Sequence, residues 1–394
     1  MPKPKKLSVK NNRNLFILYS LGLILAFSGA LPAYIQSNFL GQFVGVQAMS
    51  AYLILANLLS VLAILFFPGL IRKLSNYFLT KISLILYASS LLGLAISTNA
   101  ALALVSIILF TISSNLIWIN MDFLIEDFSI DAVTGKIRSI YFTFINIGWI
   151  LSPTLAAYLL IGKGEYTLIF LIAASLTIPF FLTFLYEGRK LQDHNKYKRL
   201  SFGLAFKRMW TKPNLRGIFF VALLLQIFFN SAVIYVPLYL FQNMGMSWEV
   251  LGPIFSIMLI PFVLVEIPAG IIADRYLGEK ELLITGFLIL SVSLFLFYYI
   301  PVPSAWLWAA VLFLSRIGAA LIEAMRETYF FKIVSVKDAD DINIFRTTTP
   351  LGHTLGSLLA IGTLFFFPLQ YLFLFLSIIM LSGFFFIASI KDTK

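Results

Sequence analysis

One arginine stands far from either end of a long apolar segment. Arg316 lies about ten residues, or roughly 15 Å of helix, from each end of the apolar run 305–327. A charged group in the middle of a bilayer costs about 2.5 kcal/mol or more, so it normally faces other protein or a wet cavity. A guanidinium group binds carboxylates and phosphates well. Arg316 is therefore a candidate for binding an anionic ligand, for pairing with an internal acid, or for a fixed structural ion pair.

Two carboxyl groups are placed at similar depth. Glu266 comes eight residues before the polar turn at Asp274, and Glu323 lies in the same apolar run as Arg316. Desolvation opposes the ionisation of a carboxyl group, and a buried carboxyl group that exchanges a proton can act as a proton carrier. Glu266 is the first candidate for that role and Glu323 is the second.

Acidic residues also form two pairs at helical i, i+4 spacing near the ends of two apolar runs. These pairs are Asp122 with Glu126, and Glu323 with Glu327. Ordinary solvation, or pairing with Arg138 and Arg326, would explain the members nearest the polar loops. A cluster of carboxylates at one membrane interface is also what an enzyme acting on lipid-linked substrates would need, so that alternative stays open.

The chain lacks the residues that several kinds of chemistry require. The chain has no cysteine, and its two histidines, His194 and His353, lie in separate segments. We therefore expect no disulfide, no thiolate nucleophile and no histidine-based metal site. The chain also lacks a G-x-x-x-x-G-K-[ST] loop for ATP. We expect no metal, no cofactor and no ATP-driven pump, so that any transport would draw on a solute or ion gradient.

The composition is that of a membrane protein. Of the 394 residues, 60% are hydrophobic and 12% are charged, against about 45–50% and about 25% in soluble domains. Apolar runs long enough to cross a bilayer recur along the chain. They are found near 14–35, 49–71, 78–96, 100–121, 139–161, 167–186, 217–241, 251–273, 282–300, 305–327, 346–366 and 371–390. Because they lack the alternating pattern of a membrane barrel, they predict an all-α integral membrane protein with twelve transmembrane helices.

The basic residues are segregated along this pattern. Of the 29 Lys and Arg residues, 27 fall in the two tails, in the segment 187–216, or in the turns 72–81, 122–138, 274–281 and 326–346. These segments share one side of the membrane, and basic residues favour the cytoplasmic side. We therefore predict a multi-pass protein of the cell membrane with both termini in the cytoplasm. The net charge of +11 is then a topology signal, and no nucleic-acid partner is expected.

The chain divides into two related halves around one polar segment. Matches recur between the halves at offsets of 201–205 residues, for example Asp122 with Glu323 and Pro32 with Pro237. Such a repeat indicates two six-helix bundles in the same orientation. We predict bundles over 1–186 and 216–394, joined by a basic linker over 187–215. Aromatic residues alternate with Lys and Arg in this linker, as in an amphipathic helix that lies on an anionic leaflet.

The segment 270–280 carries the most specific motif. Gly270, Asp274, Arg275, Gly278 and Lys280 resemble the cytoplasmic loop signature of the major facilitator superfamily, although the counterpart at 69–73 lacks the aspartate. With the twelve spans, the linker and the repeat, the resemblance covers essentially the whole chain. It implies a secondary active transporter, not an enzyme, that moves a small organic solute by alternating access and is coupled to protons. The motif would then form a gating turn, or only cap and orient that turn.

The same resemblance would place further polar residues around a central cavity. These residues are Tyr34, Asn115, Asn120, Asn146, Gln226, Asn230, Tyr235, Tyr239 and His353. Asn115 precedes Asp122 by seven residues, as Arg316 precedes Glu323, so the two halves put a polar group at the same depth. Each neutral residue could instead make a hydrogen bond between packed helices. We expect a small solute and protons as partners, with no obligate protein partner; a receptor or scaffold without transport activity is the remaining alternative.

Overall fold

The computed structural model describes residues 9–127, 134–161, 166–188, 202–334 and 339–391. Within these ranges every regular element is helical, and twelve helices or broken helices are long and apolar enough to cross a membrane. They coincide with the twelve predicted apolar runs, with ends that differ by a few residues. The prediction of an all-α protein with twelve spans is confirmed.

Spans one to six make up what we call the N-terminal half. They are α1 (Val9–Ala33), α3 (Val46–Leu74), α4 (Asn76–Ala95), α5 (Ala100–Asp127), α6 (Thr134–Leu160) and α7 (Thr167–Glu187). The short helix α2 (Gln36–Leu40) follows the first span, and α8 (Phe202–Thr211) precedes the seventh.

Spans seven to twelve make up the C-terminal half, and several of them are interrupted. Span seven comprises α9 (Pro213–Asn230), η1 (Ser231–Tyr235), α10 (Val236–Leu238) and η2 (Tyr239–Asn243), and span eight comprises α11 (Trp248–Ile257), α12 (Pro261–Leu264) and α13 (Glu266–Arg275). The others are α14 (Glu279–Tyr299), α15 (Ala305–Ile333), α16 (Ala339–Arg346) with α17 (Thr348–Phe366), and α18 (Gln370–Leu381) with α19 (Gly383–Ala388).

The interruptions of spans seven and eight have local causes. In span seven, π-helical turns lie on either side of Pro237, and the N–H of Met244 donates to the carbonyl of Tyr239 in a π-type bond of 3.0 Å. In span eight the helix opens just before Pro261, a residue that disfavours helix at the preceding position. It opens again at Val265, so that Glu266 begins a new helical segment inside the membrane span.

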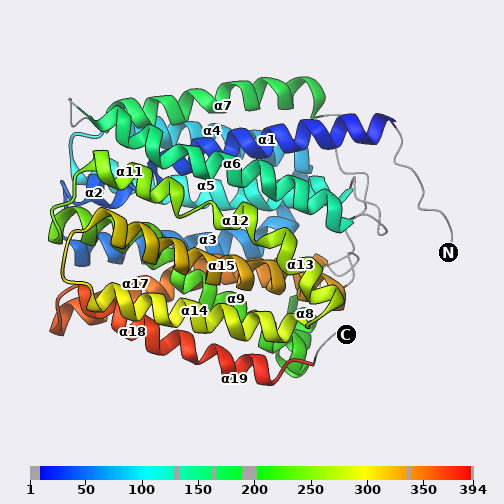
Figure 1. The fold of residues 1–394 in the computed structure, drawn as a ribbon. Helices are drawn as coiled ribbons and strands as arrows, with labels where there is room; N and C mark the ends of the chain where they lie inside the picture. The colour runs from blue at the N-terminus through cyan, green and yellow to red at the C-terminus, as the bar shows by residue number, and fades with distance from the viewer. Residues whose placement is uncertain (1–8, 128–133, 162–165, 189–201, 335–338, 392–394) are drawn as a thin grey trace.

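The two ends of the helical array differ. The first helix begins and α19 ends at one end, which we call the termini face, while α2 and α11 lie at the other end, the opposite face (Figure 1). Helix α8 lies at the termini face beside α9 and α16, and its Arg208 forms an ion pair of 3.3 Å with Asp341 of α16. Phe206 and Trp210 stack on the exposed side of α8. This basic helix with an exposed aromatic pair suits a membrane surface.

The halves meet through two main helix pairs, α3 with α17 and α6 with α11. The second pair approaches closely, because a Cβ atom added to Gly252 would lie only 2.3 Å from the Cβ of Ala157. Small residues allow such close packing of helices in membranes, where dispersion contacts replace the hydrophobic effect. The contact between α6 and α11 is therefore tight and sensitive to side-chain volume.

Side-chain pairs close the space between the halves toward the opposite face. Hydrogen bonds join Ser50 to Tyr235 at 2.7 Å and Thr154 to Ser256 at 2.7 Å. Gln242 donates to Asn38 at 3.3 Å, and Tyr34 stacks on Phe255 with ring centroids 5.2 Å apart. In each pair one residue comes from spans one to six or α2 and the other from spans seven and eight, so these contacts hold the two halves together at this end.

Candidate functional site

A cavity of about 1180 Å³ lies between the two halves. It is lined by α1, α3, α5 and α6 on one side and by α9, η1, α12, α13, α15 and α17 on the other. Its wall includes Arg138, Ile271 and Lys332, each near the end of its helix at the termini face. The cavity therefore extends from the middle of the molecule to the termini face, whereas the pairs described above close it toward the opposite face.

Most of the site residues predicted from the sequence lie in this wall. Those that do are Tyr34, Asn115, Asn146, Gln226, Asn230, Glu266, Gly270, Arg316, Glu323 and His353. Three predicted residues do not line it. Asn120 is fully buried within α5, Tyr235 bonds to Ser50, and Tyr239 packs edge-on between the rings of Trp308 and Phe373.

Arg316 occupies a buried position at the deep part of the cavity wall. It follows the start of α15 at the opposite face by 11 residues, which is about 16 Å along a helix. Its side chain is 1% exposed, lies over the Phe228 ring at 5.0 Å from the ring centre, and contacts the hydroxyl of Tyr34. No carboxylate in the described part of the chain pairs with it, and its Nη1 atom has no hydrogen-bond partner there.

Glu266 on α13 and Glu323 on α15 lie close together on the same side of the cavity. Their carboxyl groups are close enough to interact, and the side chain of Asn146 of α6 lies beside the carboxyl group of Glu266. The break at Val265 places Glu266 in the first turn of α13, where its side chain reaches the other half of the protein. Glu266 has no basic partner among the described residues, whereas Glu323 lies 3.4 Å from Arg326.

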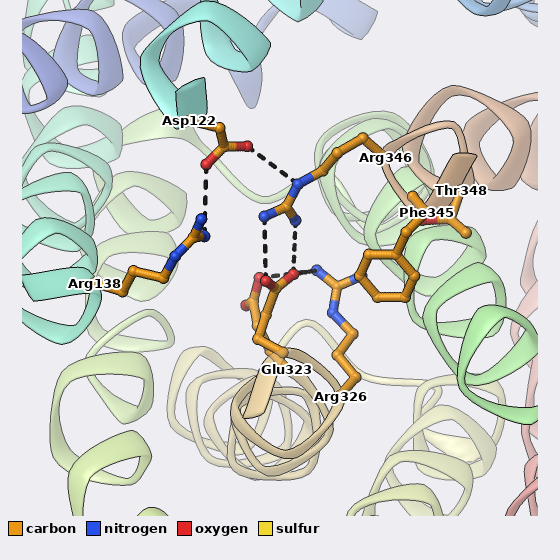
Figure 2. A network of polar contacts seen from close by, with 8 residues as sticks. Asp122, Arg138, Glu323, Arg326, Phe345, Arg346 and Thr348 are labelled. Carbon is orange, nitrogen blue, oxygen red and sulfur yellow. Dashed lines mark hydrogen bonds and ion pairs between the residues drawn. The ribbon is translucent and has the colours of Figure 1, made fainter. Parts of the chain in front are cut away.

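A group of ion pairs, which we call the termini-face network, joins the ends of α5, α6, α15 and α16 (Figure 2). Its members are Asp122, Arg138, Glu323, Arg326, Glu327 and Arg346. Arg346 is central, because its Nε lies 3.1 Å from Asp122 while its two Nη atoms lie 2.7 and 3.2 Å from the carboxylate oxygens of Glu327. The two-pronged bond to Glu327 fixes the guanidinium plane, and the pair with Asp122 crosses between the halves.

Arg138 adds a second link between the halves. It lies 3.9 Å from Asp122 within the N-terminal half and stacks over Phe331 of α15, 4.1 Å from the ring centre. The sequence indicated pairing of the interfacial acids with Arg138 and Arg326 but missed Arg346. The signal was present, since Arg346 directly precedes the apolar part of span eleven, as Arg138 precedes the apolar part of span five. Because Asp122, Glu323 and Glu327 are engaged with arginines, they give no support to a catalytic cluster.

The motif at 270–280 forms the turn between α13 and α14. The N–H of Gly278 donates to the carboxylate of Glu281 at 3.0 Å, and Lys280 donates to the carbonyl of Ile390 at 3.1 Å. These bonds tie the turn to the start of α14 and to the end of the last span. The side chains of Asp274 and Arg275, and that of Glu126 in the first half, lie outside the described part of the structure.

Twelve spans around a central cavity that is closed toward one face define a membrane carrier of small solutes. The family model described as Major Facilitator Superfamily matches residues 15–264 and 249–393, nearly the whole chain. The chain belongs to the Major Facilitator Superfamily and is thus a transporter of small solutes.

Solved structures share the fold at low sequence identity. The nucleoside transporter NupG is 16% identical, with 95% of this chain and 98% of that chain covered and a TM-score of 0.74. A POT family transporter in complex with 5-aminolevulinic acid is 14% identical, with 95% of each chain covered and a TM-score of 0.79. No curated protein matches the chain by sequence. At these identities the likeness concerns the fold, not the solute.

Proposed function

We propose that this protein is a secondary active transporter that moves a small organic solute by alternating access. The observation that carries this proposal is the cavity between the halves, which reaches the termini face and is closed at the opposite face. A cavity with one closed end is one of the two states that a carrier needs. The other state would arise if one half rocked against the other about this fixed site.

That motion would change the contacts between the halves at both faces. Opening the opposite face requires the pairs Ser50 with Tyr235 and Thr154 with Ser256 to separate. Closing the termini face would shift the helix ends that the termini-face network already joins through Asp122 and Arg346, and the turn at 270–280 would move with the ends of α13 and α14. The hydrogen bonds named at the opposite face join uncharged groups. Because they are uncharged, each costs only about 0.5–1.5 kcal/mol to break.

We further propose that the termini face is cytoplasmic in the cell membrane. The support is the concentration of Lys and Arg on this side, including α8, Lys280, Lys332 and Lys391. The cavity of this structure then faces the cytoplasm. Solute would be released to, or loaded from, the cytoplasm in this state.

We propose that Glu266 links transport to protons and that Glu323 is its interacting neighbour. It lines the cavity, has no basic partner among the described residues, and contacts Asn146 across the halves. A carboxyl group that loses its proton in one state and regains it in the other ties the conformational change to a proton gradient. Because Asn146 belongs to the other half, rocking would change the surroundings of Glu266.

The test is uptake of a mixed panel of small organic solutes into proteoliposomes, measured by mass spectrometry, with and without an imposed gradient of one pH unit. Such a gradient stores about 1.4 kcal/mol per proton, enough for about tenfold accumulation of a coupled solute. We expect the wild type to accumulate at least one solute. The variant Glu266→Gln should exchange that solute across the membrane without accumulating it.

Glu249→Gln is the matched control, because Glu249 is an exposed carboxylate at the opposite face. It should leave accumulation unchanged. Gradient-driven accumulation that persists in Glu266→Gln would exclude Glu266 as the coupling residue. If the wild type moves no member of a broad panel in either the gradient or the exchange assay, the proposal of solute transport by this cavity is contradicted.

A further inference from the structure

Among the described residues, each Lys or Arg of the cavity wall except one pairs with a carboxylate. Arg138 pairs with Asp122, and Lys332 lies 2.6 Å from Glu279 of α14. Arg316 lines the same cavity, is 1% exposed, and pairs with no carboxylate among the described residues. A guanidinium group has five donors, and here the Nη1 atom has no partner within the described structure.

Such an arrangement is costly in the ligand-free protein. A buried charge without a partner loses its hydration and gains no ion pair in return. The Phe228 ring and the Tyr34 hydroxyl compensate in part, since both place negative partial charge next to the guanidinium group. Neither one is an anion. Among the described residues no carboxylate therefore pairs with Arg316, and an anion that enters the cavity would supply this partner.

We propose that Arg316 binds the anionic group of the transported solute, and that this solute is a small organic monoanion of the carboxylate class. This inference rests on the function proposed above. Removing an anion from water to the deep end of the cavity is favourable only if a cation meets it there, and Arg316 can offer two parallel N–H donors to a carboxylate. The anion would thus seat against α15, between α1 and α9.

The number of charges supports a monoanion over a phosphate monoester. Among the described residues, Arg316 is the one cation of the wall at this depth, and its polar neighbours Asn230 and His353 belong to types that are neutral or weakly basic. A dianion would leave one charge without a partner. Aromatic side chains such as Trp149, Phe229 and Phe262 also line the cavity, and they suit an apolar or aromatic body attached to the carboxylate.

The test measures binding to the purified full-length protein in detergent, without a membrane gradient. The probes are acetate, benzoate, 3-phenylpropionate and indole-3-acetate, each compared with its primary amide, and phenyl phosphate as the dianion. Binding is followed by thermal unfolding over a concentration series. We expect at least one carboxylate to bind about 10- to 100-fold more tightly than its amide, as a charge-assisted hydrogen bond predicts.

Variants assign that preference to Arg316. In Arg316→Gln the carboxylate and its amide should bind equally, whereas Arg316→Lys should keep a reduced preference because it retains the charge without the planar fork. Lys332→Gln removes another basic residue of the wall, one that is already paired, and should keep the full preference. If Arg316→Gln does not fold, the test compares the preference for the carboxylate over its amide in Arg316→Lys and in Lys332→Gln. It should be reduced only in Arg316→Lys.

Several outcomes would overturn the inference. They are a wild type that binds none of the carboxylates better than its amide, tighter binding of phenyl phosphate than of any carboxylate, or a preference that survives Arg316→Gln. Carboxylate binding that depends on Arg316 but occurs without any transport would leave the carboxylate site standing and contradict the proposed function. Accumulation of neutral solutes alone would contradict this inference and leave the proposed function standing.

Discussion

Arg316 and Arg346 are both arginines on the C-terminal half, but their surroundings differ in one respect. Arg346 is held by two carboxylates, Asp122 and Glu327, at 3.1 Å and 2.7 Å. Arg316 has only an aromatic ring and a hydroxyl beside it in the described structure. The same substitution should therefore have opposite effects on the stability of the ligand-free protein.

We predict that Arg346→Met lowers the unfolding temperature, because it leaves buried carboxylates without their partner, a loss of up to about 3–5 kcal/mol for a fully buried pair and less for this partly exposed one. Arg316→Met should leave the unfolding temperature unchanged or raise it, since it removes a buried charge that no anion compensates. Thermal unfolding in detergent without added solute checks both. An equal loss in the two variants would mean that Arg316 has a structural partner.

The sequence was most informative about single charges inside apolar runs. Arg316, Glu266 and Glu323 stand out there, and all three line the cavity. Neutral polar residues were harder to place, because a helix presents Asn120 or Tyr239 to a partner helix as readily as to a cavity. Arg346 was missed because its partner Asp122 is far away in the chain and only packing brings the two together.

Among the elements, the contact between α6 and α11 is one of the two main contacts between the halves, and it is close. A Cβ atom at Gly252 would overlap Ala157, whereas one at Gly362 of α17 would meet nothing within 4 Å. We predict that Gly252→Val forces the two helices apart at the opposite face. Gly362→Val adds the same volume to an exposed surface and should change nothing there.

This prediction is checked with spin labels on cysteines introduced at Ile161 and Glu249, two exposed residues near the opposite-face ends of α6 and α11. The chain has no native cysteine, so labelling is specific. The distance between the labels should increase in Gly252→Val and stay the same in Gly362→Val. A distance that does not change in Gly252→Val would show that the closure does not depend on this contact.

The existence and ends of the spans followed from hydrophobic length, since the bilayer imposes it on every crossing. The breaks within the spans did not follow from hydrophobic length. Prolines occur in unbroken helices, as Pro153 in α6 and Pro179 in α7, and also at the breaks, as Pro237 and Pro261 in spans seven and eight. Neighbouring helices decide whether a freed backbone carbonyl finds another partner, and the sequence does not reveal that.

For the whole molecule, the repeat predicts two related bundles, and the bounds of these bundles stay a prediction; the Major Facilitator Superfamily match covers both halves of the chain. Which face is closed was beyond the sequence, because both states of a carrier are built from the same residues. The structure supplies that information through the pairs at the opposite face and the extent of the cavity. One state, however, shows access from one side only.

The central claim is that the cavity is reached in turn from both faces. The direct measurement uses Ser114→Cys, a small change in the cavity wall of a chain without cysteine, and a membrane-impermeant maleimide added to intact cells and, separately, to inside-out membrane vesicles. We predict labelling in both preparations, because each face opens part of the time. Labelling from the termini face alone, under every condition, would contradict alternating access and would instead indicate a one-sided binding protein such as a receptor.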